Sequence, residues 1–222
     1  MRFPVLALAL CAAMSAPAQA QFAVTADVGS TGVGAHIIVP MEPTLNGRFG
    51  ANYFKHSSNM TAGSVEYDVK TTLQTIDILF DWYPLQASAL HLTAGAVFNG
   101  NKYDATGKPN ADGNYVIADT PFSGALVSKL NGGIDYRKAA PYLGIGWGNP
   151  LTSRNAWSFT ADAGVILQGK PNATLASTGC EEDHAQCFLL VYAVQAEKAR
   201  FVDEVPRFKA YPVLRMGLAY RF

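Results

Sequence analysis

Ionisable side chains recur on one face of several otherwise apolar segments, and these are the places where the chain could do chemistry. In the segment 77–81, for example, Asp77 and Asp81 share one face of an extended strand, and Ile78 and Phe80 share the other. The charged positions of this kind are Asp27, Arg48, Asp77, Asp81, His91, Asp162, Arg215 and Arg221, with His36 among them. If these side chains face a narrow interior, they either pair with one another or line a constricted path for small polar solutes.

The first 20 residues have the pattern of a cleaved export signal. Arg2 precedes an almost purely apolar run from Val5 to Met14, and Ala18-Gln-Ala20 is a small-x-small cleavage site. We therefore expect residues 1–20 to be removed and residues 21–222 to form a single domain. Without Arg2 this domain has 16 basic residues against 17 acidic ones, so its charge gives no reason to expect a nucleic-acid partner.

Eight segments of the mature chain alternate apolar with small or polar side chains, which predicts β-strands. The expected strands are residues 22–28, 33–39, 46–55, 65–82, 90–101, 126–147, 155–169 and 210–222. The longest apolar run after the signal, Phe188 to Val194, is too short for a spanning helix, so a membrane crossing requires a closed barrel. The predicted fold is all-β, an eight-stranded antiparallel transmembrane β-barrel. Short periplasmic turns at 41–44, 84–88 and 150–154 would alternate with longer extracellular loops, among them 103–122 and 170–209.

The last of these strands carries the strongest membrane signal. Leu214, Met216, Leu218, Tyr220 and Phe222 share one face, while Arg215 and Arg221 lie on the other. This ending resembles the terminal-Phe assembly signal of Gram-negative outer-membrane barrels, so Tyr220 and Phe222 are expected to be recognised by the barrel-assembly machinery. All three tryptophans, at positions 82, 147 and 157, fall at the periplasmic ends of their strands, where an interfacial aromatic girdle is expected.

Counting residues up from the periplasmic end of each strand predicts which charges meet. The count places Asp81, Arg48 and His91 at nearly one level, and it places Asp162 level with Arg215. Because eight strands leave room for side chains and little more, mutual pairing is the simpler hypothesis and a gated path is the sharper one. The apolar parity changes between Val69 and Ile76, which predicts a β-bulge near Leu73.

The loop 170–209 contains the two cysteines of the mature chain, Cys180 and Cys187. An exported protein folds under oxidising conditions, so these thiols are expected to form a disulfide. His184 lies between them, but one His with two Cys and no further ligand is a poor zinc site. We therefore expect no metal and no cofactor. Residues 188–201 of the same loop could form a short helix that caps the barrel mouth, touches the outer leaflet or binds a partner.

A resemblance to a known family rests on the second half of the chain. The segments Ala140-Pro-Tyr-Leu-Gly-Ile-Gly-Trp147, Asn155-Ala-Trp157, Gln168-Gly-Lys-Pro-Asn172 and Tyr211-Pro-Val213 resemble the CarO family of small outer-membrane proteins. The resemblance is strongest over 125–175 and 208–222. It implies an outer-membrane barrel associated with carbapenem susceptibility and with uptake of small amino acids such as ornithine. More loosely, the chain is similar to OmpW-like and OmpA-like eight-stranded barrels.

One short motif has an enzymatic interpretation. His56-Ser-Ser58-Asn59 has the form found in outer-membrane lipid A 3-O-deacylases, with Glu66 as the nearest candidate third member. Such chemistry needs a base within hydrogen-bond reach of the serine. The motif lies early in the chain and in a predicted loop, whereas in that family it lies late, so we expect an ordinary polar loop and no catalytic residues.

These patterns predict a protein of the Gram-negative outer membrane, with outer-membrane lipid and lipopolysaccharide as its surroundings. The first hypothesis for its function is a small channel or passive uptake protein for small polar solutes such as amino acids. The alternative is a non-conducting barrel with a structural or surface-interaction role, and a lipid A-modifying enzyme comes third.

Overall fold

The computed structural model describes residues 21–62, 65–85, 88–180, 185–204 and 209–222. The predicted export signal and His184 lie outside the described residues. The strands are β1 (Ala23–Gly29), β2 (Gly32–Glu42), β3 (Leu45–Ala62), β4 (Val65–Trp82), β5 (Leu90–Asn99), β6 (Lys102–Lys108), β7 (Asn114–Ile117), β8 (Thr120–Ser123), β9 (Lys129–Asp135), β10 (Ala139–Trp147), β11 (Trp157–Ile166), β12 (Asn172–Thr178) and β13 (Tyr211–Arg221). The helix α2 spans Ala185–Glu204. The all-β, antiparallel prediction is confirmed.

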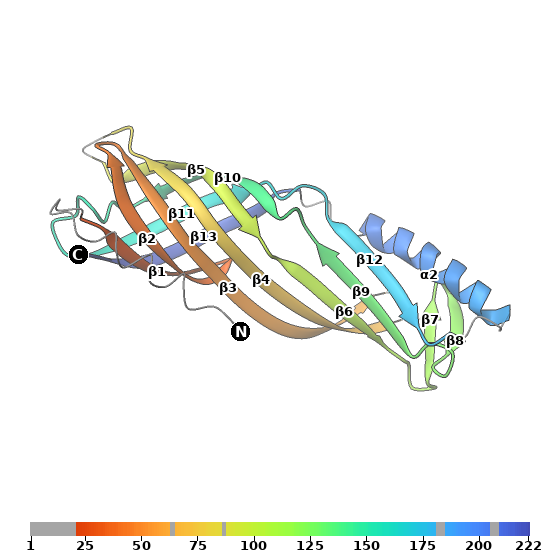
Figure 1. Cartoon of the computed structure of the whole chain (residues 1–222). Coiled ribbons are helices and arrows are strands. Elements are labelled where there is room, and N and C mark those ends of the chain that lie inside the picture. The colour runs from red at the N-terminus through yellow and green to blue at the C-terminus, as the bar shows by residue number, and fades with distance from the viewer. Residues whose placement is uncertain (1–20, 63–64, 86–87, 181–184, 205–208) are drawn as a thin grey trace, which may run out of the picture.

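Eight of these strands close into a ring of antiparallel pairs (Figure 1). The order around the ring is β1, β2, β3, β4, β5, β10, β11 and β13, and β13 pairs back with β1. Large apolar side chains such as Ile76, Leu143 and Leu218 stand about half exposed on the outside of this ring. An outward apolar belt on a closed ring is the arrangement expected of strands that face lipid.

The strand count of eight was too low for the whole chain. The predicted loop 103–122 contains most of β6 together with β7 and β8, and the predicted ribbon 126–147 divides into β9 and β10. The predicted loop 170–209 contains β12 and α2. Outside the ring, β4 exchanges its partner β5 for β6, and β6, β9 and β12 then extend the sheet beyond the barrel. The loops continue as strands because β3 and β4 project past the ring and offer an unpaired edge.

The sheet inverts its polarity where it leaves the ring. On β4 the outward side chains Ile76 and Phe80 are exposed and apolar, while the inward Asp77 is buried. On the part of the same strand that projects beyond the ring, the outward Lys70 is exposed and the inward Leu73 is buried. The predicted bulge near Leu73 is wrong, because β3 and β4 keep one unbroken register from Leu45↔Trp82 to Ala62↔Val65. The change of parity marks the exit from an apolar surrounding into water.

Beyond the ring, α2 and the β7–β8 hairpin cover the inward face of the extended sheet (Figure 1). Their shared core consists of Tyr67, Tyr115, Ile117, Phe122, Val127, Leu130, Leu190, Ala193 and Val194. Burial, with Glu197 nearby, raises the pKa of the Tyr67 hydroxyl to about 12, so this group stays neutral at physiological pH. We call this part, made of β6 to β9, β12, α2 and the upper halves of β3 and β4, the extension. No helix among the described residues is long and apolar enough to cross a membrane.

Leu190→Ala is expected to loosen the extension and leave the barrel unchanged. Leu190 is 1% exposed at the centre of the extension core, and removing a buried leucine side chain costs about 2–5 kcal/mol. Limited proteolysis of the refolded protein should then cleave the extension faster, while the barrel band survives. The neighbouring Leu189 is 63% exposed, so Leu189→Ala is the matched control and should digest like the wild type. Equal digestion of the two variants would contradict the packing described here.

Candidate functional site in the barrel interior

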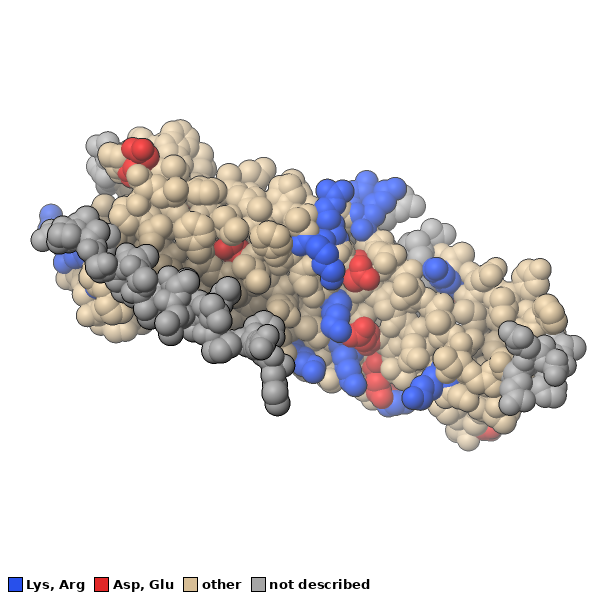
Figure 2. All heavy atoms as spheres, in the orientation of Figure 1, with Lys and Arg blue, Asp and Glu red and all other residues tan. Residues whose placement is uncertain are grey.

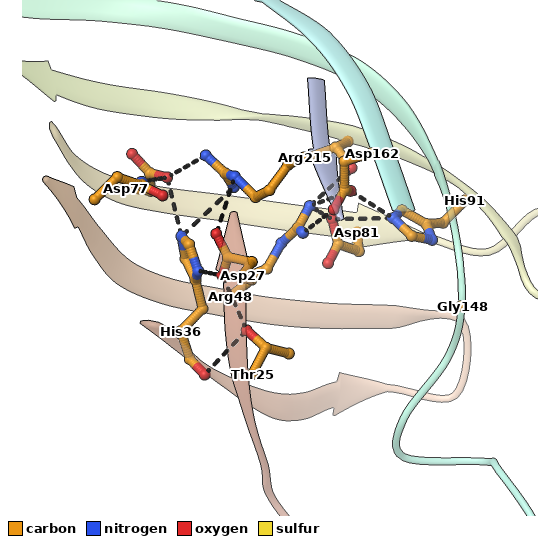
Figure 3. A network of polar contacts seen from close by, with 12 residues as sticks. Thr25, Asp27, His36, Arg48, Asp77, Asp81, His91, Gly148, Asp162 and Arg215 are labelled. Atoms are coloured by element: carbon orange, nitrogen blue, oxygen red, sulfur yellow. Dashed lines mark hydrogen bonds and ion pairs between the residues drawn. The ribbon is translucent and has the colours of Figure 1, made fainter. Parts of the chain in front are cut away.

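The inward side chains of the ring form two ion-pair clusters (Figure 3). In the first, Arg48 of β3 donates from both terminal nitrogens to the two carboxylate oxygens of Asp162 on β11, over 2.8 and 2.9 Å. The same guanidinium donates to Asp81 of β4 over 2.9 Å. The Thr93 hydroxyl donates to Asp81 over 2.7 Å, and Nε2 of His91 lies 3.3 Å from Asp162. One arginine therefore binds two carboxylates, and a histidine approaches them from the side.

The second cluster is centred on Asp77 of β4. One oxygen of Asp77 lies 2.8 Å from Nη2 of Arg215, 3.0 Å from Nε2 of His36 and 2.9 Å from the side-chain nitrogen of Asn52. The other ring nitrogen of His36 lies 2.8 Å from Asp27. With a carboxylate oxygen at both ring nitrogens, both contacts are satisfied together when the imidazole carries both protons. His36 then bridges two aspartates and, with Arg215, balances their charge.

The strongest ion pair of each cluster crosses the barrel. Around the ring, β3 and β11 are four strands apart in either direction, and so are β4 and β13. Arg48–Asp162 and Arg215–Asp77 therefore each join opposite walls. Arg48, Asp77, Asp162 and Arg215 are all buried. Two braces made of charge-assisted hydrogen bonds hold the opposite walls together and occupy the centre of the interior.

An apolar cluster fills a further part of the interior. It consists of Leu79, Val97, Ala140, Tyr142, Ile166 and Val213, all of them buried, with Tyr211 packed against it. The inward position Leu79 lies between Asp77 and Asp81 on β4, so apolar and charged groups share this stretch of the interior. Side chains of ring strands therefore pack across the interior as in a soluble core, and they exclude water from the ion pairs.

Two glycines give the clusters the space that they occupy. A Cβ at Gly146 would meet His91 and Asp162, and a Cβ at Gly50 would meet the His36 ring and the Ala35 carbonyl oxygen. The rings of both histidines thus lie against glycine backbone. This explains why small residues alternate with the charges along these strands.

Most of the sequence-predicted charges lie together, with two differences in detail. Asp27, Arg48, Asp77, Asp81, His91, Asp162 and Arg215 are buried in the interior. Asp81 contacts both Arg48 and His91, the two residues that the count had grouped with it. Asp162 and Arg215 are direct register partners on β11 and β13, but each side chain pairs with another residue across the barrel. Arg221 lies apart, at the end of β13, where it donates to the Leu151 carbonyl oxygen over 3.0 Å.

Sequence reasoning missed the apolar part of the interior. Leu79, Tyr142, Ile166 and Val213 occupy inward positions, which the barrel pattern assigns to polar groups. The sequence did contain a signal for this apolar interior. On β4 the inward residue Leu79 is as apolar as its outward neighbour Phe80. His36, named only as an inward residue, is a central member of the second cluster.

The remaining predictions concern the extension. Cys180 and Cys187 form the predicted disulfide, which ties the end of β12 to the first turn of α2. His56 and Ser58 lie on the inward face of β3, whereas Glu66 lies on the outward face of β4 and accepts a hydrogen bond from Asn59. Glu66 therefore faces away from His56 and Ser58, and the three residues do not form a catalytic triad.

Comparison with known proteins agrees with this architecture. No protein-family model matches the chain, and no curated protein matches it. The crystal structure of Acinetobacter baumannii CarO is similar with 26% identity and a TM-score of 0.56, over 90% of this chain and 97% of that one. Acinetobacter baumannii CarO2 is similar with 23% identity and a TM-score of 0.58, over 91% and 99% of the two chains. A major outer membrane protein from Thermus thermophilus matches with 18% identity and a TM-score of 0.45, over 92% and 100%. The resemblance to CarO-like outer-membrane barrels that was inferred from the sequence is confirmed.

Proposed function

We propose that the chain crosses the outer membrane with the eight strands of its ring, and that the interior of this barrel is closed to solutes. The observation that carries the proposal is the pair of ion-paired braces, Arg48–Asp162 and Arg215–Asp77, which span the interior between opposite walls. Such a barrel is a non-conducting anchor, and it holds the extension outside the cell. On this proposal the chain is not an enzyme, and its contacts with other molecules are made by the extension and the outer rim.

Export and assembly belong to the same proposal. Cleavage after Ala20 would place Phe22 near the start of the mature chain, and its ring stacks on the terminal Phe222 with centroids 4.9 Å apart. Tyr220 packs against the same Phe222 ring, with centroids 4.8 Å apart. Phe222 is 62% exposed, so it remains accessible at the barrel end. These rings support recognition of Tyr220 and Phe222 by the assembly machinery.

Uptake of small polar solutes is the second candidate. It is favoured by the fact that side chains make the closing contacts, since arginine side chains can change rotamer without unfolding a strand. The glycines that line the interior, such as Gly50 and Gly146, would leave space once those side chains move. In this case Arg48 and Arg215 would be the gate.

Solute entry into proteoliposomes distinguishes the two candidates. Vesicles holding refolded residues 21–222 are expected to admit glycine, ornithine and a disaccharide no faster than empty vesicles. The variant Arg48→Ala/Arg215→Ala removes both braces and is expected to admit the amino acids. The control is Arg154→Ala/Arg221→Ala. It removes two charges at the barrel end that lies away from the extension, and this variant should stay closed. Selective amino-acid entry through the wild type would contradict the closed barrel and support the uptake candidate.

A further inference from the structure

A belt of basic side chains surrounds much of the barrel where the extension begins. Figure 2 shows it as a blue band that crosses the middle of the molecule, with several acidic side chains along its extension side, and the barrel surface on its other side is largely uncharged. The basic residues that the chain places at this height, all exposed, are Lys55, Lys70, Lys102, Arg137, Lys138, Lys170 and Lys209. We call these seven residues the outer rim.

Register places three rim residues on one face of the sheet. Lys55 of β3 is the partner of Thr72 on β4, and Thr72 is the partner of Lys102 on β6. Directly opposed residues of an antiparallel pair point to the same side, so Lys55 and Lys102 project outward in one row. Lys70 lies two residues above Thr72 on this face. The row lies above the last outward apolar residue of β4, Ile76, which is 52% exposed.

Four other rim residues lie farther around the same rim, beginning beside Lys102, whose register partner on β9 is Asp135. The Lys138 carbonyl oxygen accepts from Asn99 at the end of β5, and the Lys209 carbonyl oxygen accepts from Gly169 after β11. Lys170 follows Gly169 in the chain, and Nε of Arg137 lies beside the same glycine. No carboxylate among the described residues forms an ion pair with any of these four side chains. Of the seven rim cations only Lys102 has such a partner in the described part of the chain, Asp104, 3.2 Å away and well exposed.

The charge distribution along the barrel is asymmetric. At the opposite end the basic side chains in the described residues are Arg154 and Arg221, and Arg221 is occupied by the Leu151 carbonyl oxygen. Contact with water alone does not require seven cations at one end of the barrel, directly above an apolar belt. Such a position, at the boundary between hydrocarbon and water, is where lipid headgroups lie. Cations there attract anionic headgroups within about one Debye length.

We propose that the outer rim binds the phosphate groups of an anionic glycolipid in the outer leaflet, with Arg137, Lys138, Lys170 and Lys209 as its main site. The inference rests on the proposed membrane position of the barrel. Lysine and arginine are the side chains that recognise phosphate, and the four unpaired cations come from three segments that converge at one edge of the ring. The acyl chains of the same lipid would lie against the outward residues below, such as Leu167 and Leu214.

The test is binding of deep-rough lipopolysaccharide to the refolded protein in a neutral detergent, measured by fluorescence titration. The rim variant is Arg137→Gln/Lys138→Gln/Lys170→Gln/Lys209→Gln. It is expected to bind roughly a hundredfold to a thousandfold more weakly than the wild type, on the order of what four cations near an anionic surface contribute. The wild type should lose a similar factor when the glycolipid has been dephosphorylated.

The matched control removes four exposed or half-exposed cations elsewhere, Lys108→Gln/Lys129→Gln/Arg154→Gln/Lys198→Gln, and should bind within about twofold of the wild type. Equal weakening in both variants, or an unaltered rim variant, would overturn the proposal. Binding of inorganic phosphate as tight as that of the glycolipid would overturn the assignment to lipid.

The outer-membrane fraction of cells is examined in parallel. Absence of the wild type from that fraction would contradict the proposed function itself, whereas an inserted rim variant with normal binding contradicts the rim site alone.

Discussion

Arg48→Met is expected to lower the free energy of unfolding of the barrel by about 3–5 kcal/mol, because it leaves two buried carboxylates without their cation. Asp81 and Asp162 are 2% and 7% exposed, and Arg48 donates to both of them. Methionine retains much of the length of the arginine side chain, so the loss of charge and hydrogen bonds dominates. The measurement is the urea midpoint, followed by the gel-mobility difference between folded and unfolded barrels.

The effect can be separated from a general loss of arginine. Arg154→Met removes an exposed guanidinium outside the interior and should change the free energy of unfolding by less than about 0.5 kcal/mol. The triple variant Arg48→Met/Asp81→Asn/Asp162→Asn removes the stranded charges as well, and it should recover most of the lost stability. A midpoint for Arg48→Met equal to that of Arg154→Met would show that the brace does not stabilise the barrel.

The sequence pattern identified the ring because lipid imposes a strict rule on each strand. Inside the membrane, outward side chains must be apolar at every second position, so segments such as 155–169 and 210–222 could be placed without knowledge of the fold. Parity also shows which charges face inward, and Arg48, Asp81 and His91, which the count had grouped, meet at Asp81. The height of a residue along the barrel does not by itself determine its ion-pair partner. The long side chain of Arg215 reaches Asp77 on the opposite wall instead of its register partner Asp162.

The extension could not be predicted by the same rule. Above the membrane an antiparallel strand alternates in the opposite sense, as Lys70 and Leu73 do on β4. This reversed polarity was interpreted as a bulge within the predicted strand 65–82. The partners of β6, β9 and β12 depend on contacts between distant segments, such as Asp135↔Asn172, which no local pattern encodes. The interior core around Tyr142 was missed for a related reason, since inward positions were assumed to be polar throughout.

Gly50→Val is expected to destabilise the barrel by about 3 kcal/mol, because it disturbs backbone packing and the second charge cluster together. Gly50 is the register partner of His36, and a Cβ at this position would meet the His36 ring and the Ala35 carbonyl oxygen. The His36 imidazole cannot rotate away without losing these contacts, because its two nitrogens lie 2.8 and 3.0 Å from Asp27 and Asp77. The free energy of unfolding in urea is again the measurement.

Gly132→Val provides the control for a larger side chain in a strand. Gly132 lies on β9 in the extension, and the atom nearest to an added Cβ, on the Leu175 side chain, is 3.6 Å away, which is an ordinary contact. This variant should change stability by less than about 1 kcal/mol, since valine favours strands. If Gly50→Val is as stable as Gly132→Val, His36 does not depend on its two aspartates for its position. A Gly50→Val variant that is much less stable would confirm that the His36 ring and the Ala35 carbonyl oxygen pack directly against the backbone of β3.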